Sequence, residues 1–150
     1  KYLFFMLSIS HYKIVAIGKI KKSWTQKGIE MYLKRLPGLQ IIEIKNSTQT
    51  KEEYSIKELI KNNDILVTLN EKGQSFTSNQ LAKKLLDSPT QNITFAIGGA
   101  TGFSKSLDNF ASWKLSLSPL TFPHEIARLL LIEQLYRAKT IIQGGPYHKQ

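Results

Sequence analysis

The sequence of 150 residues contains no cysteine, few acidic residues and only three histidines. Without cysteine the chain has no disulfide, no zinc–thiolate centre and no thiol nucleophile, and a cytoplasmic location fits this lack. His11, His124 and His148 do not form the H-E-x-x-H spacing of zinc hydrolases, and no carboxylate cluster accompanies them. We therefore expect no metal site.

Long hydrophobic runs are also missing. The purely apolar run near the N-terminus, Tyr2 to Leu7, is too short to cross a bilayer, so we expect no membrane partner. We interpret residues 1–11 as an N-terminal appendage without a functional role. Residues 12–150 are interpreted as one domain, because this length is typical of a single hydrophobic core.

Acidic residues are about half as numerous as basic ones, 11 against 21, which gives a formal net charge of +10. Both halves of the chain carry the excess, so no basic tail accounts for it. A polyanion such as nucleic acid is the expected partner, and a lysine-rich solvated surface is the alternative.

Short β-branched runs alternate with helical patterns, which predicts βα units, a largely parallel sheet and an α/β fold. The expected strands are 12–17, 39–44, 65–69, 93–97 and 114–117. Three pairs have the spacing of a capping box that starts a helix: Ser23 with Gln26, Thr50 with Glu53, and Thr77 with Gln80. A short helix is expected over 105–112, and a long one from Pro123 or His124 to Ile142.

The long helix carries apolar residues over more than one stripe of its surface. One sheet does not bury them all, so the helix either lies centrally in the core or packs against a second subunit. We favour the homodimer.

Two loops have the composition of a binding site. In FAIGGATGFS, residues 95–104, three glycines follow an apolar strand, which suits the close approach of a ligand to the backbone. In LSLSPLTFPHE, residues 115–125, two prolines bracket a rigid apolar loop that suits a flat, uncharged heterocycle. The alternatives are a tight turn and an ordinary strand-to-helix connection.

The C-terminal part combines His124, Arg128 and Arg137 on one helix with a short tail, Tyr147-His148-Lys149. An aromatic ring, an imidazole and a cation suit stacking on a base and contact with phosphate. The alternatives are a frayed terminus and an i, i+4 ion pair between Glu133 and Arg137.

Four segments, in this order and spacing, resemble the bacterial ribosomal large subunit methyltransferase H family, which is of the SPOUT class. They are VTLN at 67–70, IGGATGFS at 97–104, LSPLTFPHEIARLLLIEQLYRA at 117–138 and PYHK at 146–149. The resemblance implies a single-domain SPOUT α/β knot, in which a mostly parallel sheet is flanked by helices and the segment after residue 114 forms a C-terminal trefoil knot. It also implies a homodimer.

The activity implied by the resemblance is transfer of a methyl group from S-adenosyl-L-methionine to N3 of a pseudouridine in 23S ribosomal RNA of the large ribosomal subunit. The implied cofactor-binding residues are Leu69, Gly98, Gly99, Leu117, Ser118, Pro119, Leu120, Thr121 and Phe122. The implied catalytic candidates for the general base are His124 and His148, and RNA positioning is assigned to Arg128, Arg137, Tyr147 and Lys149. Relatives often end with arginine where this chain has Lys149, which keeps the charge but not the bidentate fork.

Three other functions compete with this one. A SPOUT methyltransferase acting on another RNA nucleotide would share the donor loops, and a non-catalytic RNA-binding or ribosome-binding protein would share the basic surface. A nicotinamide-dependent oxidoreductase is disfavoured, because no acidic residue follows the glycine loop at the distance that a ribose hydroxyl requires.

Overall fold

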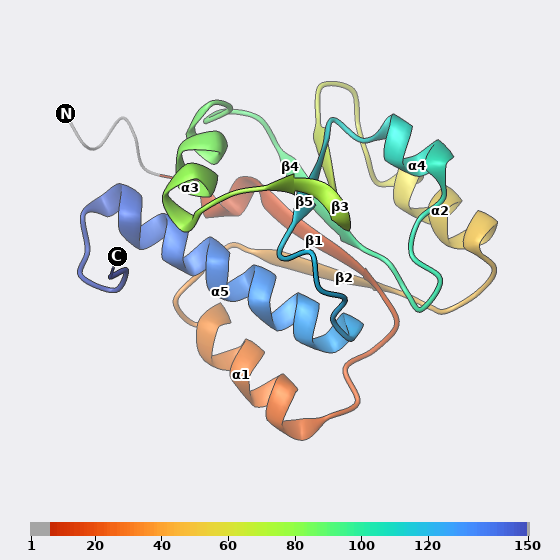
Figure 1. Cartoon of the computed structure of the whole chain (residues 1–150), viewed down its shortest axis with the longest axis horizontal. Helices are drawn as coiled ribbons and strands as arrows, with labels where there is room; N and C mark the ends of the chain where they lie inside the picture. The colour runs from red at the N-terminus through yellow and green to blue at the C-terminus, as the bar shows by residue number, and fades with distance from the viewer. Residues whose placement is uncertain (1–6, 150) are drawn as a thin grey trace.

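The computed structural model describes residues 7–149 and shows one five-stranded sheet with helices on both faces (Figure 1). The strand order is β2-β1-β4-β3-β5, and every neighbouring pair is parallel. The strands are β1 (Tyr12–Ile17), β2 (Gln40–Ile44), β3 (Ile65–Ser75), β4 (Ile93–Ile97) and β5 (Trp113–Ser116). The helices are α1 (Ser23–Leu33), α2 (Gln49–Glu58), α3 (Ser78–Leu86), α4 (Lys105–Phe110) and α5 (His124–Gln143), and a 3-10 turn, η2, covers Ile9–His11. The predicted α/β class and parallel sheet are confirmed.

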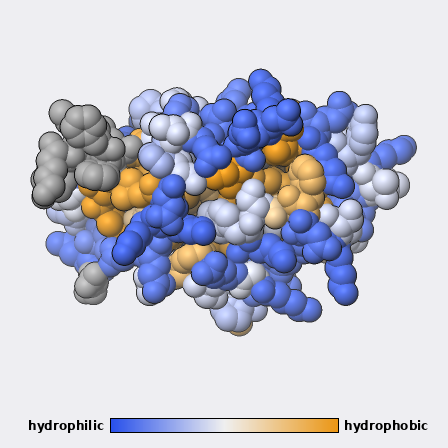
Figure 2. Space-filling model, turned by 90° about the horizontal axis from the view of Figure 1, so that it is seen from above, coloured by the Kyte–Doolittle hydropathy of each residue, from blue (hydrophilic) through white to orange (hydrophobic). Residues whose placement is uncertain are grey.

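The sheet separates two hydrophobic clusters because successive strand residues point to opposite faces. Helices α1, α3 and α5 cover one face of the sheet, and α2 and α4 cover the other (Figure 1). Ile14 and Ala16 of β1 belong to the larger cluster on the first face, whereas Val15 and Ile17 belong to the smaller cluster on the second. Phe95 of β4 is completely buried in the larger cluster. Figure 2 shows the molecule from above. On this face, hydrophobic side chains reach the surface along the middle and are framed by hydrophilic ones.

The segment before Tyr12 is partly packed against the domain. Leu7 and Ile9 are buried in the larger cluster, and Ser10 lies against Gly38. The domain boundary at residue 12 stays a prediction, and the part of the appendage before Leu7 lies outside the described residues.

Strand β3 is longer than the predicted strand, which ended at Leu69. It pairs with β5 up to Leu69, bulges out, and resumes pairing at Gln74. Gly73 permits this, because a Cβ atom there would lie 2.9 Å from the carbonyl of Lys114. The polar sequence NEKGQS has no strand periodicity, so the extension depends on the neighbouring strand and was not predictable from pattern.

The three predicted capping boxes had different outcomes. Thr77 with Gln80 is confirmed as a reciprocal box. The box at Thr50 is wrong because Thr48 caps α2 instead, accepting a hydrogen bond from the Lys51 N–H. The box at Ser23 is also wrong, since Lys22 is the N-cap residue of α1 and its side chain makes no capping bond.

These caps predict different effects of two similar substitutions. Thr77→Ala removes a side-chain cap and should lower the free energy of unfolding by about 1 kcal/mol, whereas Ser23→Ala should change it by less than about 0.5 kcal/mol. Urea denaturation of both variants measures the difference. Equal losses would contradict the assignment of the caps.

Much of the apolar surface of α5 is covered within the chain itself. Leu129 packs against Gly28 of α1, and Leu131, Ile132 and Leu135 are completely buried in the larger cluster. Contacts with α1, α3 and β4 thus make α5 a central helix. Ile126 and Leu130 are partly exposed and belong to neither buried cluster, so the homodimer stays a prediction.

Candidate functional site

A cavity of 420 Å³ lies at the carboxyl ends of β3, β4 and β5. Parallel strands present their carboxyl ends at the same sheet edge, where ligands bind in open α/β sheets. The glycine loop, residues 98–102, and the proline loop, residues 117–123, both line it. The structure therefore brings together the two loops that the sequence placed in a binding site.

The glycine loop needs glycine for its own packing as well as for space in the cavity. A Cβ atom on Gly98 would lie 3.3 Å from the backbone of Gly102, and one on Gly99 would lie 3.3 Å from the Ile17 side chain. Gly102 has a φ of +66° and donates its N–H to the Gly99 carbonyl over 3.0 Å. A side chain at Gly98 would therefore shift the loop that forms the cavity wall.

Nearly all predicted cofactor-binding residues line the cavity. The lining ones are Leu69, Gly98, Gly99, Leu117, Ser118, Leu120, Thr121 and Phe122. Pro119 is exposed and is not among the residues that border the cavity. Ser118 fixes the proline loop locally, because its hydroxyl accepts the Leu120 N–H over 3.1 Å. Pro119 is therefore better explained as a residue that restricts this turn.

Asn70 also lines the cavity and was not predicted. Its amide donates to Asp108 over 3.0 Å, and its oxygen accepts the N–H of Lys72 over 2.9 Å. Thr68 donates to the other oxygen of Asp108 over 3.2 Å. Asp108, which lies on α4, thus fixes the start of the β3 bulge through these two side-chain hydrogen bonds. The available signal was a polar residue directly after the buried part of a strand.

Arg128 does not fit its predicted role in RNA positioning. Its guanidinium is buried, with a side-chain exposure of 3%, and pairs with Glu43 over 2.6 Å. It also donates to the Gly18 carbonyl over 3.0 Å. Because both contacts tie α5 to the first two strands, we assign Arg128 to holding the connection from β1 to α1.

Glu125 secures the same connection one turn earlier on α5. Its buried carboxylate accepts the backbone N–H groups of Lys21 and Lys22 over 3.1 and 3.2 Å. Burial by itself raises the pKa of this carboxyl, but the two backbone hydrogen bonds and the charges of His124 and Lys22 outweigh it. The pKa of Glu125 is therefore below its ordinary value.

The lowered pKa predicts a pH-dependent contribution to stability. A carboxyl whose pKa is lower in the folded state stabilises the fold above its unfolded pKa and loses that effect as the pH falls through its folded pKa. Glu125→Gln should therefore lower the melting temperature at neutral pH, and the gap to wild type should close below pH about 4. A constant gap, or the same pattern in the exposed control Glu30→Gln, would contradict this.

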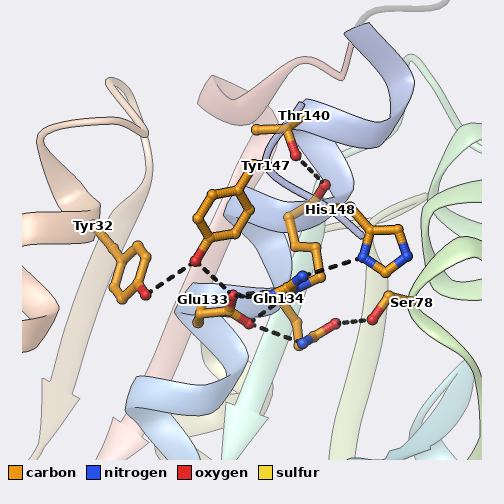
Figure 3. Close-up of polar contacts among 8 residues, drawn as sticks. Tyr32, Ser78, Glu133, Gln134, Thr140, Tyr147 and His148 are labelled. Carbon is orange, nitrogen blue, oxygen red and sulfur yellow. Dashed lines mark hydrogen bonds and ion pairs between the residues drawn. The ribbon is translucent and has the colours of Figure 1, made fainter. Parts of the chain in front are cut away.

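The C-terminal tail folds back onto α5 (Figure 3). Arg137 pairs with Glu133 over 2.6 Å, so the predicted i, i+4 ion pair is confirmed. The hydroxyl of Tyr147 donates to Glu133 over 2.9 Å and lies 3.2 Å from that of Tyr32. Burial and these two bonds raise the pKa of Tyr147. Arg137 and Tyr147 are therefore committed to holding the tail.

His148 occupies a different place from His124. His124 lines the cavity, whereas His148 is held in the tail by a 3.1 Å contact between its Nδ1 atom and Arg137 (Figure 3). Because arginine can only donate, the Nδ1 atom is the acceptor in this hydrogen bond. Lys149, the next residue, is exposed. The two predicted candidates for the base are not brought together in one chain.

No group of three or more histidine, aspartate and glutamate side chains within residues 7–149 could hold a metal ion. None of the helices described there is both long and apolar enough to cross a membrane.

Comparison with known proteins gives consistent matches over nearly the whole chain. Residues 11–148 match the family described as "Predicted SPOUT methyltransferase". A protein of Prochlorococcus marinus (strain NATL2A) named "Ribosomal RNA large subunit methyltransferase H" is 77% identical over 97% of this chain and 100% of its own length. Proteins of the same name from Prochlorococcus marinus (strain MIT 9211) and Synechococcus sp. (strain CC9311) are 53% and 51% identical, over 96% and 93% of this chain and 99% and 97% of their own lengths.

Proposed function

The chain belongs to the SPOUT methyltransferase family, and from this premise we propose that it methylates RNA of the large ribosomal subunit at N3 of a pseudouridine. The observation that carries the proposal is the cavity formed jointly by the glycine loop and the proline loop. The names of the relatives support ribosomal RNA as the substrate, and the net charge of +10 suits a polyanion. Because its proposed substrate is ribosomal RNA, the proposal places the enzyme in the cytoplasm.

The residues of the cavity fit S-adenosyl-L-methionine as the methyl donor. The volume of 420 Å³ is within the range of about 300–1,000 Å³ for small-molecule sites. Leu117 and Phe122 supply an apolar lining, and the glycine loop exposes backbone atoms where side chains would intrude. When bound, this cofactor supplies an electrophilic methyl group on a sulfonium. The two loops hold it and align the methyl group with the acceptor nitrogen, a contribution worth roughly 7–11 kcal/mol.

The acceptor imide must also lose a proton, and we assign this step to His124. It lies on the first turn of α5 and lines the cavity, whereas the Nδ1 atom of His148 is already occupied by Arg137. Asn70, which also lines the cavity, is held in place by its hydrogen bond to Asp108. We also propose that the segment after residue 114 threads into a knot and that the protein assembles as a homodimer. Exposed Trp24 and Met31 on α1 support an association surface.

Substitution of each histidine separates the two candidates. His124→Ala should lower kcat by about 10²–10⁴ while leaving donor affinity within a few-fold, because a general base adds this much to the rate. His148→Gln should lower kcat much less and leave the pH profile of kcat intact. Single-turnover methylation across pH measures both. The reverse order of effects would move the base to the tail.

The proposed activity itself has a direct test. Ribosomes and large subunits from a strain lacking the enzyme are incubated with the purified protein and methyl-labelled S-adenosyl-L-methionine, and the modified nucleotide is located by mass spectrometry. Label at N3 of one pseudouridine is expected. Donor binding by calorimetry without any transfer would favour a non-catalytic RNA-binding protein, and label on another nucleotide would favour a different SPOUT methyltransferase.

A further inference from the structure

The loops that follow β1 and β2 lie at the same sheet edge as the donor cavity. All five strands are parallel, and β1 and β2 continue the sheet beyond β4. Asn46, in the loop after β2, lies beside both the loop after β1 and the glycine loop. Its side chain is 3.0 Å from a Cβ atom placed on Gly18 and 3.6 Å from one placed on Gly99. Gln49 also donates to the Gly102 carbonyl over 3.2 Å. The surface is therefore continuous with the glycine loop.

This edge carries a group of exposed lysines, which we call the basic edge. It consists of Lys19, Lys21 and Lys22 after β1, and Lys45 and Lys51 after β2. Lys45 and Lys51 also border a surface hollow of 480 Å³. Spacing of several cations over two adjacent loops suits the phosphates of a nucleic acid backbone.

The acidic groups beside the basic edge are already engaged. Glu43 pairs with the buried Arg128, Glu52 accepts the Ser47 N–H over 2.8 Å, and Glu125 accepts the N–H groups of Lys21 and Lys22. The ion pairs within residues 7–149 involve Arg128 and Arg137, so the lysines of the basic edge form none there. Their positive charge thus remains available to a ligand.

We infer that the basic edge is the docking surface for the RNA strand that leads the acceptor nucleotide to the cavity. The inference rests on the proposed function and replaces Arg128, Arg137 and Tyr147 as the principal phosphate contacts, since those side chains are engaged within the chain. His124 lines the cavity, and the next residue, Glu125, binds the backbone of Lys21 and Lys22, so this part of the basic edge lies close to the cavity.

The test compares two triple variants that change the net charge equally. The first variant, Lys21→Gln/Lys22→Gln/Lys45→Gln, alters the basic edge. The control, Lys34→Gln/Lys61→Gln/Lys83→Gln, alters exposed lysines at or near the C-terminal ends of α1, α2 and α3, toward the opposite sheet edge. Binding of each to large ribosomal subunits from a strain lacking the enzyme is measured over a range of salt concentrations. The basic-edge variant should bind roughly 10- to 100-fold more weakly at 0.15 M salt, and its plot of log affinity against log salt should be less steep by about 2–3 units. The control should keep the wild-type slope.

Two further measurements keep the outcomes distinct. Calorimetric affinity for S-adenosyl-L-methionine should be the same in wild type and both variants, and Lys21→Arg/Lys22→Arg/Lys45→Arg should restore RNA binding. The inference would be overturned if both glutamine variants lost RNA affinity equally or if neither lost any. A changed oligomeric state with unchanged RNA affinity would also overturn it. Because the readout is RNA binding, absence of methyl transfer by the wild type would refute the proposed function without deciding the role of the basic edge.

Discussion

Gly98→Val is expected to abolish binding of S-adenosyl-L-methionine and all methyl transfer, while the protein remains folded. The valine Cβ would start 3.3 Å from the backbone of Gly102, and its methyl groups would extend further, so the loop that forms one wall of the cavity must move. Gly98 has no positive φ, so the backbone conformation itself tolerates a side chain. Isothermal titration with the donor measures the loss, and circular dichroism with thermal melting verifies the fold.

A graded series strengthens this experiment. Gly98→Ala adds only the Cβ atom at its tight 3.3 Å contact and should weaken donor binding less than valine does. Gly144→Asn is the matched control, since Gly144 ends α5 at a φ of +74° with open space around its Cβ position, and asparagine tolerates this conformation. Unchanged donor affinity in Gly98→Val would remove the glycine loop from the binding site.

Arg128→Met is expected to have the largest effect on stability among the charged residues considered. It leaves the Gly18 carbonyl without its donor and Glu43 without its ion-pair partner. Because Glu43 is 38% exposed and can be hydrated, we expect a loss of about 2–3 kcal/mol, below the upper range for a fully buried pair. For a chain of this length that corresponds to a fall in melting temperature of roughly 5–10 °C.

The comparison variant is Arg137→Met, which breaks an i, i+4 pair whose arginine side chain is 24% exposed, against 3% for Arg128. It should destabilise the protein less, by about 1 kcal/mol or below. Arg128→Met should also leave the salt dependence of RNA binding unchanged, because its guanidinium is not at the surface. A fall in that slope with unchanged stability would restore Arg128 to the RNA interface.

The sequence predicted the parts of the fold whose signals are local. Strands β1 and β4 have the expected bounds, because their apolar runs end at turn residues. The starts of α1 and α2 were placed nearly correctly, but for the wrong reason in each case. The connection that leads into α1 is held by Glu125, more than a hundred residues away in the chain, and no local pattern reveals such a partner.

The candidate site was predictable where backbone atoms form it and less so where side chains do. Glycine and proline each favour particular backbone conformations, so both loops were recognisable in the sequence. Most of the residues that line the cavity were therefore identified. The burial of Arg128 was not predictable, because sequence shows a charge but not its surroundings, and its partner Glu43 is 85 residues away. Asn70 was missed because its importance depends on Asp108 in another element.

The first helix of this protein depends on the last. Glu125 and Arg128 in α5 bind the connection between β1 and α1 across 103 to 110 residues of intervening sequence. During synthesis on the ribosome, α1 emerges long before these partners exist, so its attachment to the sheet is completed only when the chain is nearly finished. The proline loop and the start of α5 also line the cavity, so a nascent chain that has not yet released α5 lacks one wall of the methyl-donor site.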